Sequence, residues 1–339
     1  MTQIKVDNVV DAAGTAAADF TSGLTVAGAA LSTLNAAEYY ETGTEPTSPK
    51  NGAIWKDTAN DKVMVYIAGE FKEVELGAGG GVADWTVDLS SVTYDSVYFD
   101  VNSYDGAMQG ASFSTDGTKL FMSGASGDNV YQFSLSTAYD ISTLSYDSVT
   151  LDVSAKEATS RDVFISSDGA ELYVVGSSSD SVHQYSLSTA NDLSTATFSN
   201  SFSVSSQTSN PYAIYITSDG TKMYIGEFSS KVHQYTLSTA FDISSASHDS
   251  SLTVGQTAIM GVFLNPSGTK LYWMSQSTDI VYQYTLSTAF DISTATADSN
   301  TFSLGNGDWA DISFSLDGTK MYALNYAGSD RLHQYSTGL

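Results

Sequence analysis

The octapeptide Ser114-Thr115-Asp116-Gly117-Thr118-Lys119-Leu120-Phe121 decides the fold, because variants of it return four more times along the chain. The turn glycines of the five copies are Gly117, Gly169, Gly220, Gly268 and Gly318. They are separated by 52, 51, 48 and 50 residues. A period near fifty residues predicts an architecture made of copies of one structural unit.

The second copy shows what that unit is. Short alternating apolar segments are separated by an Asp168-Gly169 turn and by loops rich in glycine and serine. The segments span residues 162–166, 171–175, 182–187 and 198–204. Such spacing predicts four antiparallel strands, the size of one propeller blade.

The two ends of the chain settle the number of blades. The last copy stops at residues 335–339, after its third strand. Residues 85–96 align without gaps on residues 137–148, so residues 92–101 supply the missing fourth strand. The sequence therefore predicts an all-β, five-bladed propeller closed by an N-terminal strand.

The phrase at residues 114–121 and its copies resemble YVTN/lactonase-like propeller repeats, over residues 85–339. The resemblance implies the propeller fold. It implies no particular activity, because such repeats occur in enzymes, surface layers and adhesins alike.

Residues 1–81 differ in composition from the repeats. We expect an extended anchoring segment (1–37), a small module of three β-strands (38–76) and a glycine-rich linker (77–84). Residues 49–62, PKNGAIWKDTANDK, resemble modules of phage tail-fibre and related virion proteins. The resemblance implies attachment to virion proteins through residues 1–81, a location on the virion surface, and a homotrimer as one open possibility.

Composition excludes several classes. The chain has 13 Lys+Arg against 38 Asp+Glu, a net charge of −25, which repels nucleic acid and anionic membrane surfaces. No apolar stretch reaches the roughly twenty residues of a membrane helix. The absence of cysteine excludes disulfides and cysteine-based metal sites, and the N-terminus has no secretory pattern. These features fit a protein made in the host cytoplasm that acts outside it.

The two faces of the predicted propeller differ in variability. The Asp-Gly turns and the Leu-Ser-Thr-Ala segments share one face, here called the bottom, and are nearly constant. The loops of the other face, the top, differ in every blade, which favours recognition, although drift of unselected loops is the alternative. The candidate binding residues on the top face are Tyr104, Met108, Arg161, Tyr212, Phe228, Met260, Trp309 and Tyr326.

Two acids raise the question of catalysis. Asp162 and Asp311 share a repeat position at the start of the innermost strand, where a glycosidase could place an acid/base pair. We favour the explanation that these aspartates bind a cation or channel water, or accept hydrogen bonds from loop amides. His183, His233 and His333 share another position and are interpreted as packing between blades. We expect no cofactor and no metal site, and the Asp-Gly turns are interpreted as hairpin turns.

Three functions follow from these observations. The first is a phage virion protein of fibre or adhesin type, without enzymatic activity, that binds a host-surface glycan or receptor through the top face. The second is a capsid (head-fibre or decoration) or tail appendage without receptor binding. The third is a glycan-degrading enzyme that uses Asp162 and Asp311.

Overall fold

The computed structural model describes residues 24–26, 29–31, 39–42, 54–57, 62–67, 70–74, 84–326 and 330–339. The chain divides into two units, Met1–Ala83 and Asp84–Leu339, and each is treated by itself. In the first unit, β1 (Leu24–Val26) pairs antiparallel with β2 (Ala29–Leu31). The other described strands form a sheet: β3 (Tyr39–Thr42), β4 (Ile54–Asp57), β5 (Lys62–Ile67) and β6 (Glu70–Val74).

That sheet corrects one expectation. The expected module had three strands, but Tyr39–Thr42 adds a fourth, which runs parallel to Ile54–Asp57. The remaining expectations for residues 1–81, including the anchoring segment and the linker, fall largely outside the described residues.

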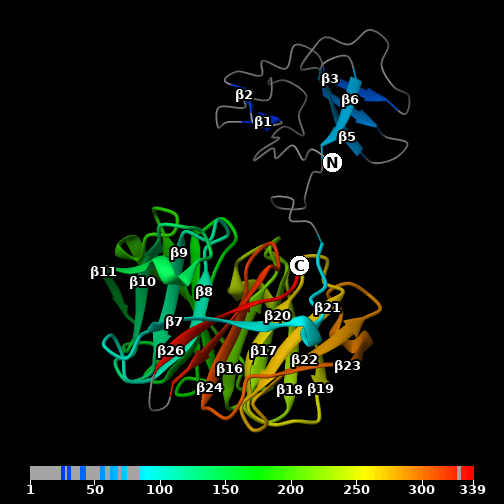
Figure 1. Ribbon diagram of the computed structural model, residues 1–339. Coiled ribbons are helices and arrows are strands. Elements are labelled where there is room, and N and C mark those ends of the chain that lie inside the picture. Colours follow the sequence, from blue (N-terminus) through cyan, green and yellow to red (C-terminus); the bar gives the residue numbers. More distant parts are fainter. Residues whose placement is uncertain are drawn as a thin grey trace. The chain divides into compact units, whose positions relative to one another are not determined.

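The second unit is a ring of five four-stranded antiparallel sheets, as predicted (Figure 1). Blade 1 comprises β8 (Met108–Phe113), β9 (Lys119–Gly124), β10 (Asn129–Leu135) and β11 (Leu144–Asp152). Blade 2 comprises β12 (Ser160–Ile165), β13 (Glu171–Gly176), β14 (Ser181–Leu187) and β15 (Ala196–Ser203). Blade 3 comprises β16 (Pro211–Ile216), β17 (Lys222–Glu227), β18 (Lys231–Leu237) and β19 (Ala246–Thr253). Blade 4 comprises β20 (Ile259–Leu264), β21 (Lys270–Ser275), β22 (Ile280–Leu286) and β23 (Ala295–Ser303).

Blade 5 joins the two ends of the ring. It comprises β24 (Trp309–Phe314), β25 (Lys320–Asn325), β26 (Arg331–Ser336) and β7 (Thr93–Asp100). β7 pairs antiparallel with β26, with Thr93 opposite Ser336 and Asp100 opposite Arg331. The cyan β7 therefore lies beside the red β26 (Figure 1). The predicted closure by the N-terminal strand is confirmed.

The repeated phrase forms the bottom turns through local hydrogen bonds. In blade 1, Oδ1 of Asp116 accepts from the Ser114 hydroxyl at 2.6 Å and from the Thr118 amide at 3.0 Å. Gly117 has a φ of +68°, and the Tyr139 ring lies directly over it. A side chain would be strained by this φ and would collide with the ring, so the turn requires glycine.

At four of the five seams, a glutamine on the third strand of one blade bonds to the next blade. Oε1 of Gln132 accepts from the Leu193 amide of blade 2 at 2.8 Å, and Oε1 of Gln334 accepts from the Ile141 amide of blade 1 at 3.1 Å. These amides begin short 3₁₀ helices, η3 (Leu193–Thr195) and η2 (Ile141–Thr143). Gln184 and Gln234 repeat the bond at the next two seams, but Oε1 of Gln283 has no partner at the seam between blades 4 and 5.

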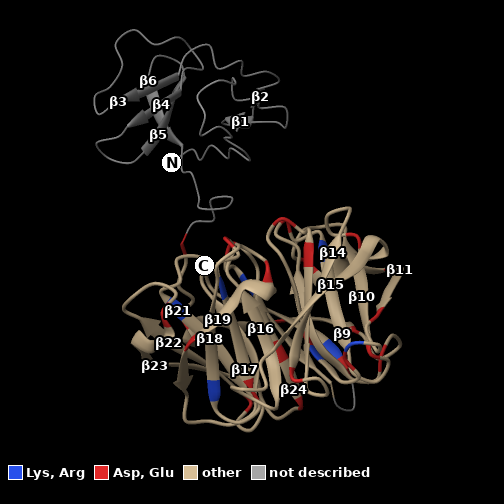
Figure 2. Ribbon diagram, turned by 180° about the vertical axis from the view of Figure 1, so that it is seen from behind, with Lys and Arg blue, Asp and Glu red and all other residues tan. Residues whose placement is uncertain are grey.

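Four of the five blades carry the same lysine–aspartate ion pair. Lys119 contacts Asp147 at 2.8 Å, and the same carboxylate accepts from Gln132 and Ser134. Three other blades repeat the network with Lys222–Asp249, Lys270–Asp298 and Lys320–Asp95. Acidic segments are spread over the propeller and outnumber basic ones (Figure 2). No described helix is long and apolar enough to cross a membrane.

Candidate functional site

Each innermost strand carries a β-bulge at the same place, where the chain arrives from the top face. The pairing with the second strand skips one residue in every blade, between Met108 and Gly110 in blade 1, for example. A bulge re-aims the side chain of the extra residue. The five extra residues, all different, are Gln109, Arg161, Tyr212, Met260 and Ala310.

In blades 2 and 3, two of these residues, Arg161 and Tyr212, stack with Phe228, which follows β17; the three together are called the Arg161 platform. The guanidinium carbon of Arg161 lies 4.4 Å from the centre of the Tyr212 ring. The rings of Tyr212 and Phe228 are 4.8 Å apart. Phe228 is 38% exposed, so the platform presents an aromatic surface beside a cation.

Polar groups surround the platform. Nε of Arg161 donates to the Ser177 hydroxyl at 3.1 Å, and Nη1 reaches Oε1 of Gln109 at 3.5 Å. Among the ion pairs of the described residues, none includes Arg161. Its remaining N–H groups are therefore available to a ligand.

Tyr326 of blade 5 lies on the same face. Its hydroxyl accepts from Nε2 of Gln276 in blade 4 at 2.7 Å. Burial raises the pKa of Tyr212; the Arg161 charge opposes this rise, and Tyr326 adds to it. The structure thus brings together Arg161, Tyr212 and Phe228, three of the eight predicted binding residues, whereas Tyr326 packs against the core cluster that contains Met108 and Leu324.

The remaining four residues do not form part of the platform either. Met108, Met260 and Trp309 are buried, so the expectation of exposed side chains is wrong for them. They are apolar side chains at the start of an innermost strand, where packing between blades removes them from water. Trp309 lies edge-on to His333, and its Nε1 donates to the Gly305 carbonyl at 2.9 Å.

Tyr104 is half-buried and fills a different space. Its ring packs against Phe133 at 5.1 Å and Tyr146 at 4.9 Å, both in blade 1, and stacks on Phe99 of β7 at 6.3 Å. It therefore lies between the outer strands of blades 5 and 1, and contributes to the core rather than to the platform.

Asp162 and Asp311 join innermost strands of adjacent blades. The two oxygens of Asp162 accept from the amides of Val163 at 2.7 Å and Ile214 at 2.8 Å. Asp311 repeats this arrangement with the amides of Ile312 at 2.7 Å and Ala111 at 2.8 Å. Both side chains are buried. The amides that they bind lie in strands, and not in the top loops as expected.

Glycines in the preceding blades make room for these acids. A Cβ on Gly110 would collide with Asp162, and a Cβ on Gly261 would lie 2.8 Å from Oδ1 of Asp311. Burial raises the pKa of both carboxyls well above the usual range, and Asp162 adds to the effect on Asp311. Each acid forms a clasp between blades, with every carboxyl oxygen engaged by an amide.

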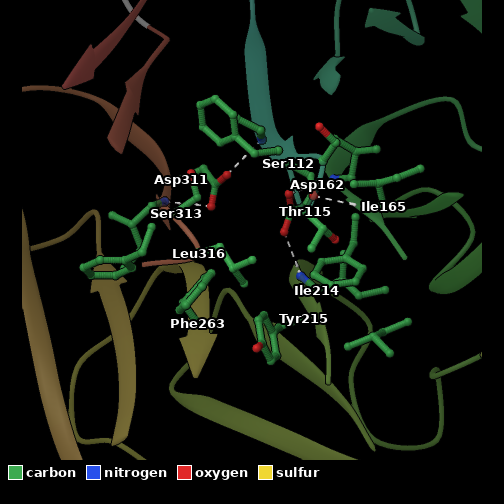
Figure 3. A pocket seen from close by; sticks show the side chains of 18 of the residues that line it. Ser112, Thr115, Asp162, Ile165, Ile214, Tyr215, Phe263, Asp311, Ser313 and Leu316 are labelled. Atoms are coloured by element: carbon green, nitrogen blue, oxygen red, sulfur yellow. Dashed lines mark hydrogen bonds between the residues drawn. The ribbon is translucent and has the colours of Figure 1, made fainter. Parts of the chain in front are cut away.

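The central channel contains a cavity of about 120 Å³. Figure 3 shows Asp162 and Asp311 in its wall, together with Tyr215 and Phe263. The cavity is far smaller than the roughly 300–1,000 Å³ of ligand pockets. It has no room for a sugar bound against both acids.

Sequence reasoning missed the acids that order the top loops. Glu157 is buried and accepts from the amides of Thr159, Ser178 and Ser179, which fixes the loop before β14. Burial opposes ionisation, but hydrogen bonds from His183, Ser178 and Ser179 lower the pKa of Glu157 to about 2. Asp105 holds the corresponding loop of blade 1. The sequence signal that could have indicated these two acids is their shared place in the repeat, four residues after Val101 and Val153.

The three histidines at the shared repeat position occupy two kinds of environment. His183 and His233 are buried and lie 3.8 and 3.3 Å from Glu157 and Glu227. His333 is half-buried beside Trp309 and Tyr94. These positions agree with the interpretation of the three histidines as packing groups. The sequence did not indicate that His183 and His233 have glutamate partners. Within the described ranges, no group of three or more His, Cys, Asp or Glu could hold a metal ion.

Comparison with known proteins identifies no family. No known family's sequence profile matches the chain, and no curated protein matches it. The resemblance to YVTN/lactonase-like repeats and to phage modules therefore stays a prediction. Among solved structures, the β-propeller domain of Cps50 (Swd1) from Myceliophteria thermophila matches with 14% identity and a TM-score of 0.42. The match covers 68% of this chain and 70% of that one.

Proposed function

We propose that the propeller is a non-enzymatic recognition domain that binds a host-surface glycan through the Arg161 platform. Residues 1–81 attach it to a phage virion, where it is displayed on the surface. The observation that carries the proposal is the stacked group of Arg161, Tyr212 and Phe228, built on bulged residues that differ in all five blades.

The scaffold around the platform supports a binding role. The bottom turns repeat the same hydrogen bonds around Asp116, Asp219 and Asp317, as folding requires. The top loops instead vary, and buried acids hold two of them in fixed conformations. Variable loops held on a rigid scaffold are typical of recognition surfaces.

The chemistry of the platform suits a sugar. The apolar C–H face of a pyranose packs on an aromatic ring such as Phe228. Arg161 and Ser177 supply hydrogen-bonding groups for the hydroxyls around it, and the buried Gln109 helps to hold Arg161 in place. Only a few rings take part, so we expect a single-site affinity of about 1 mM, which several copies on one particle would raise through avidity.

The enzyme hypothesis has less support than binding. A glycosidase acid must reach the scissile bond, and two catalytic carboxyls need roughly 5–10 Å of space between them for the sugar. Asp162 and Asp311 are buried and engaged by strand amides. These contacts account for both residues without catalysis.

The proposal for residues 1–81 rests on the resemblance of residues 49–62 to virion modules. It includes virion proteins as partners and leaves a homotrimer open. A deletion of residues 1–81 that still assembles onto particles would contradict attachment through this segment.

A glycan array tests binding directly. The full chain is displayed multivalently, as wild type and as the Tyr212→Ala/Phe228→Ser variant, with His248→Ala as a matched control for an exposed ring outside the platform. We expect wild type and control to bind the same glycans and the double variant to lose them. Equal binding by all three proteins would refute the platform. Absence of any binding would favour the capsid or tail appendage without receptor binding.

A further inference from the structure

The outer strand of blade 5 carries an exposed aromatic group away from the Arg161 platform. Tyr94 and Tyr98, both on β7, are 44% and 48% exposed. They flank His333, with ring centres 5.6 and 6.0 Å from its ring, and Nδ1 of His333 lies 3.3 Å from the Tyr94 hydroxyl. Two exposed tyrosines therefore lie on a strand whose other exposed residues are polar.

Comparison between blades shows that the propeller fold does not require Tyr98. Tyr98 pairs with His333, and the corresponding residues of the other blades pair with the same position of the third strand. Those residues are Thr150, Ser201, Ser251 and Thr301. In blades 2 and 3 the serine bonds to the histidine, His183 or His233, at 2.8 and 2.9 Å. A small hydroxyl side chain thus satisfies the fold, and the large exposed ring in blade 5 calls for another explanation.

A cation completes the group. The guanidinium carbon of Arg331 lies 4.2 Å from the centre of the Tyr98 ring. The Arg331 side chain is 34% exposed, and the carboxylate oxygen of Asp100 with which it pairs is 4.0 Å from its Nε. The exposed part of the guanidinium can therefore donate hydrogen bonds to a ligand. Asp100 is well exposed and can accept hydrogen bonds from a ligand.

The size of the aromatic surface indicates the kind of ligand. A tyrosine contributes roughly 150–250 Å² when fully buried, so the exposed parts of Tyr94 and Tyr98 amount to about 200 Å². A stable protein interface needs about 800 Å² from each partner. The exposed neighbours on the strand are polar, Thr93, Ser96 and Asp100, and do not extend the apolar area. The area matches one or two sugar rings better than a protein.

We propose that Tyr94, Tyr98, Arg331 and Asp100, together the blade-5 patch, form a second saccharide-binding site. The sugar stacks on the two tyrosine rings, Arg331 donates to its ring or hydroxyl oxygens, and Asp100 accepts from its hydroxyls. This site is independent of the Arg161 platform, which lies on blades 2 and 3.

The test uses the full chain and saturation-transfer NMR. The probes are the methyl glycosides of glucose, galactose, mannose, rhamnose, N-acetylglucosamine and glucuronic acid, each at about 10 mM to suit weak stacking sites. Tyr98→Thr introduces the residue that blades 1 and 4 already carry, so the variant should fold. Tyr98→Phe keeps the ring, and Tyr212→Ala removes the other site.

We expect at least one glycoside to bind the Tyr212→Ala protein, with an affinity that falls about tenfold or more on adding Tyr98→Thr and changes little on adding Tyr98→Phe. Thermal unfolding should be the same for both tyrosine variants. Binding that survives Tyr98→Thr would overturn the proposal, as would the absence of binding to the Tyr212→Ala protein. A change in oligomeric state on Tyr98→Thr would also overturn it, by showing that the patch contacts another copy. The platform is tested by the difference between wild type and Tyr212→Ala, and the patch by the binding that remains in Tyr212→Ala, so the two sites can fail separately.

Discussion

Trp85 is expected to hold the ring closed. It is 6% exposed and packs on Phe263, Tyr272 and Phe314, with ring centres 6.0, 5.9 and 5.5 Å away. Its ring lies over Gly318, as Phe290 lies over Gly268 and Tyr139 over Gly117. Its Nε1 donates to the Leu316 carbonyl at 3.0 Å, the counterpart of the Tyr139 hydroxyl donating to the Thr115 carbonyl. Trp85 thus covers the turn glycine of blade 5, as a loop residue covers it in blades 1 and 4.

The Trp85→Ala substitution should therefore destabilise the propeller strongly. Replacing a buried tryptophan with alanine costs roughly 3–5 kcal/mol, which for a domain of this size lowers the melting temperature by about 10 °C. The assay is chemical and thermal unfolding followed by circular dichroism, combined with amide hydrogen exchange. Exchange should rise first in β7 and β26, because these strands close the ring.

Phe290→Ala is the matched control, because Phe290 covers a turn glycine in a blade built from one continuous stretch of chain. It should reduce stability without selectively exposing β7. Deletion of residues 85–101 should abolish cooperative unfolding, because it leaves an open edge on blade 5. If Trp85→Ala costs less than about 1 kcal/mol, or if β7 exchanges no faster than the other outer strands, the closure argument is wrong.

Two further predictions concern the buried polar groups. Gly110→Ala should destabilise the propeller because the new methyl group collides with Asp162. In urea unfolding, the Gly110→Ala/Asp162→Ala double variant should lose less stability than the sum of the two single variants, with a coupling of about 1 kcal/mol or more. Strict additivity would contradict the clasp. Burial and the Arg331 charge lower the pKa of His333 to about 4, so the unfolded chain binds more protons than the folded one between about pH 6.5 and 4. Stability from His333 should thus be lost as pH falls through that range, and His333→Gln should flatten the decline in unfolding curves at several pH values; an unchanged slope would show that His333 is not responsible.

The fold could be predicted from local signals that recur. Each Asp-Gly turn is fixed by contacts within a few residues, such as the Asp116 bonds to Ser114 and Thr118. Five copies at a regular period then determine five blades, and the unmatched strand at residues 92–101 determines the closure. The structure places that strand at Thr93–Asp100, within two residues of the expectation.

The site could be predicted only in part. The positions of Arg161, Tyr212, Phe228 and Tyr326 on the top face followed from the repeat. The stacking of the first three did not follow, because it depends on a bulge that turns Arg161 toward a residue of the next blade. Trp309 looked like a surface aromatic in the sequence, but its burial depends on contacts with β26 and with the Gly305 carbonyl.

The sequence alone determined the repeat, the blade count, the closing strand and the acidic, cysteine-free surface. Tertiary structure decided which side chains are exposed, that Asp162 and Asp311 clasp adjacent blades, and that Tyr94 and Tyr98 remain uncovered. The physical reason is the distance along the sequence over which each feature depends on other residues. Turns and strand periodicity depend on residues close together in the chain, whereas exposure and polar pairing depend on the neighbouring blade, whose contacting residues lie about fifty positions away.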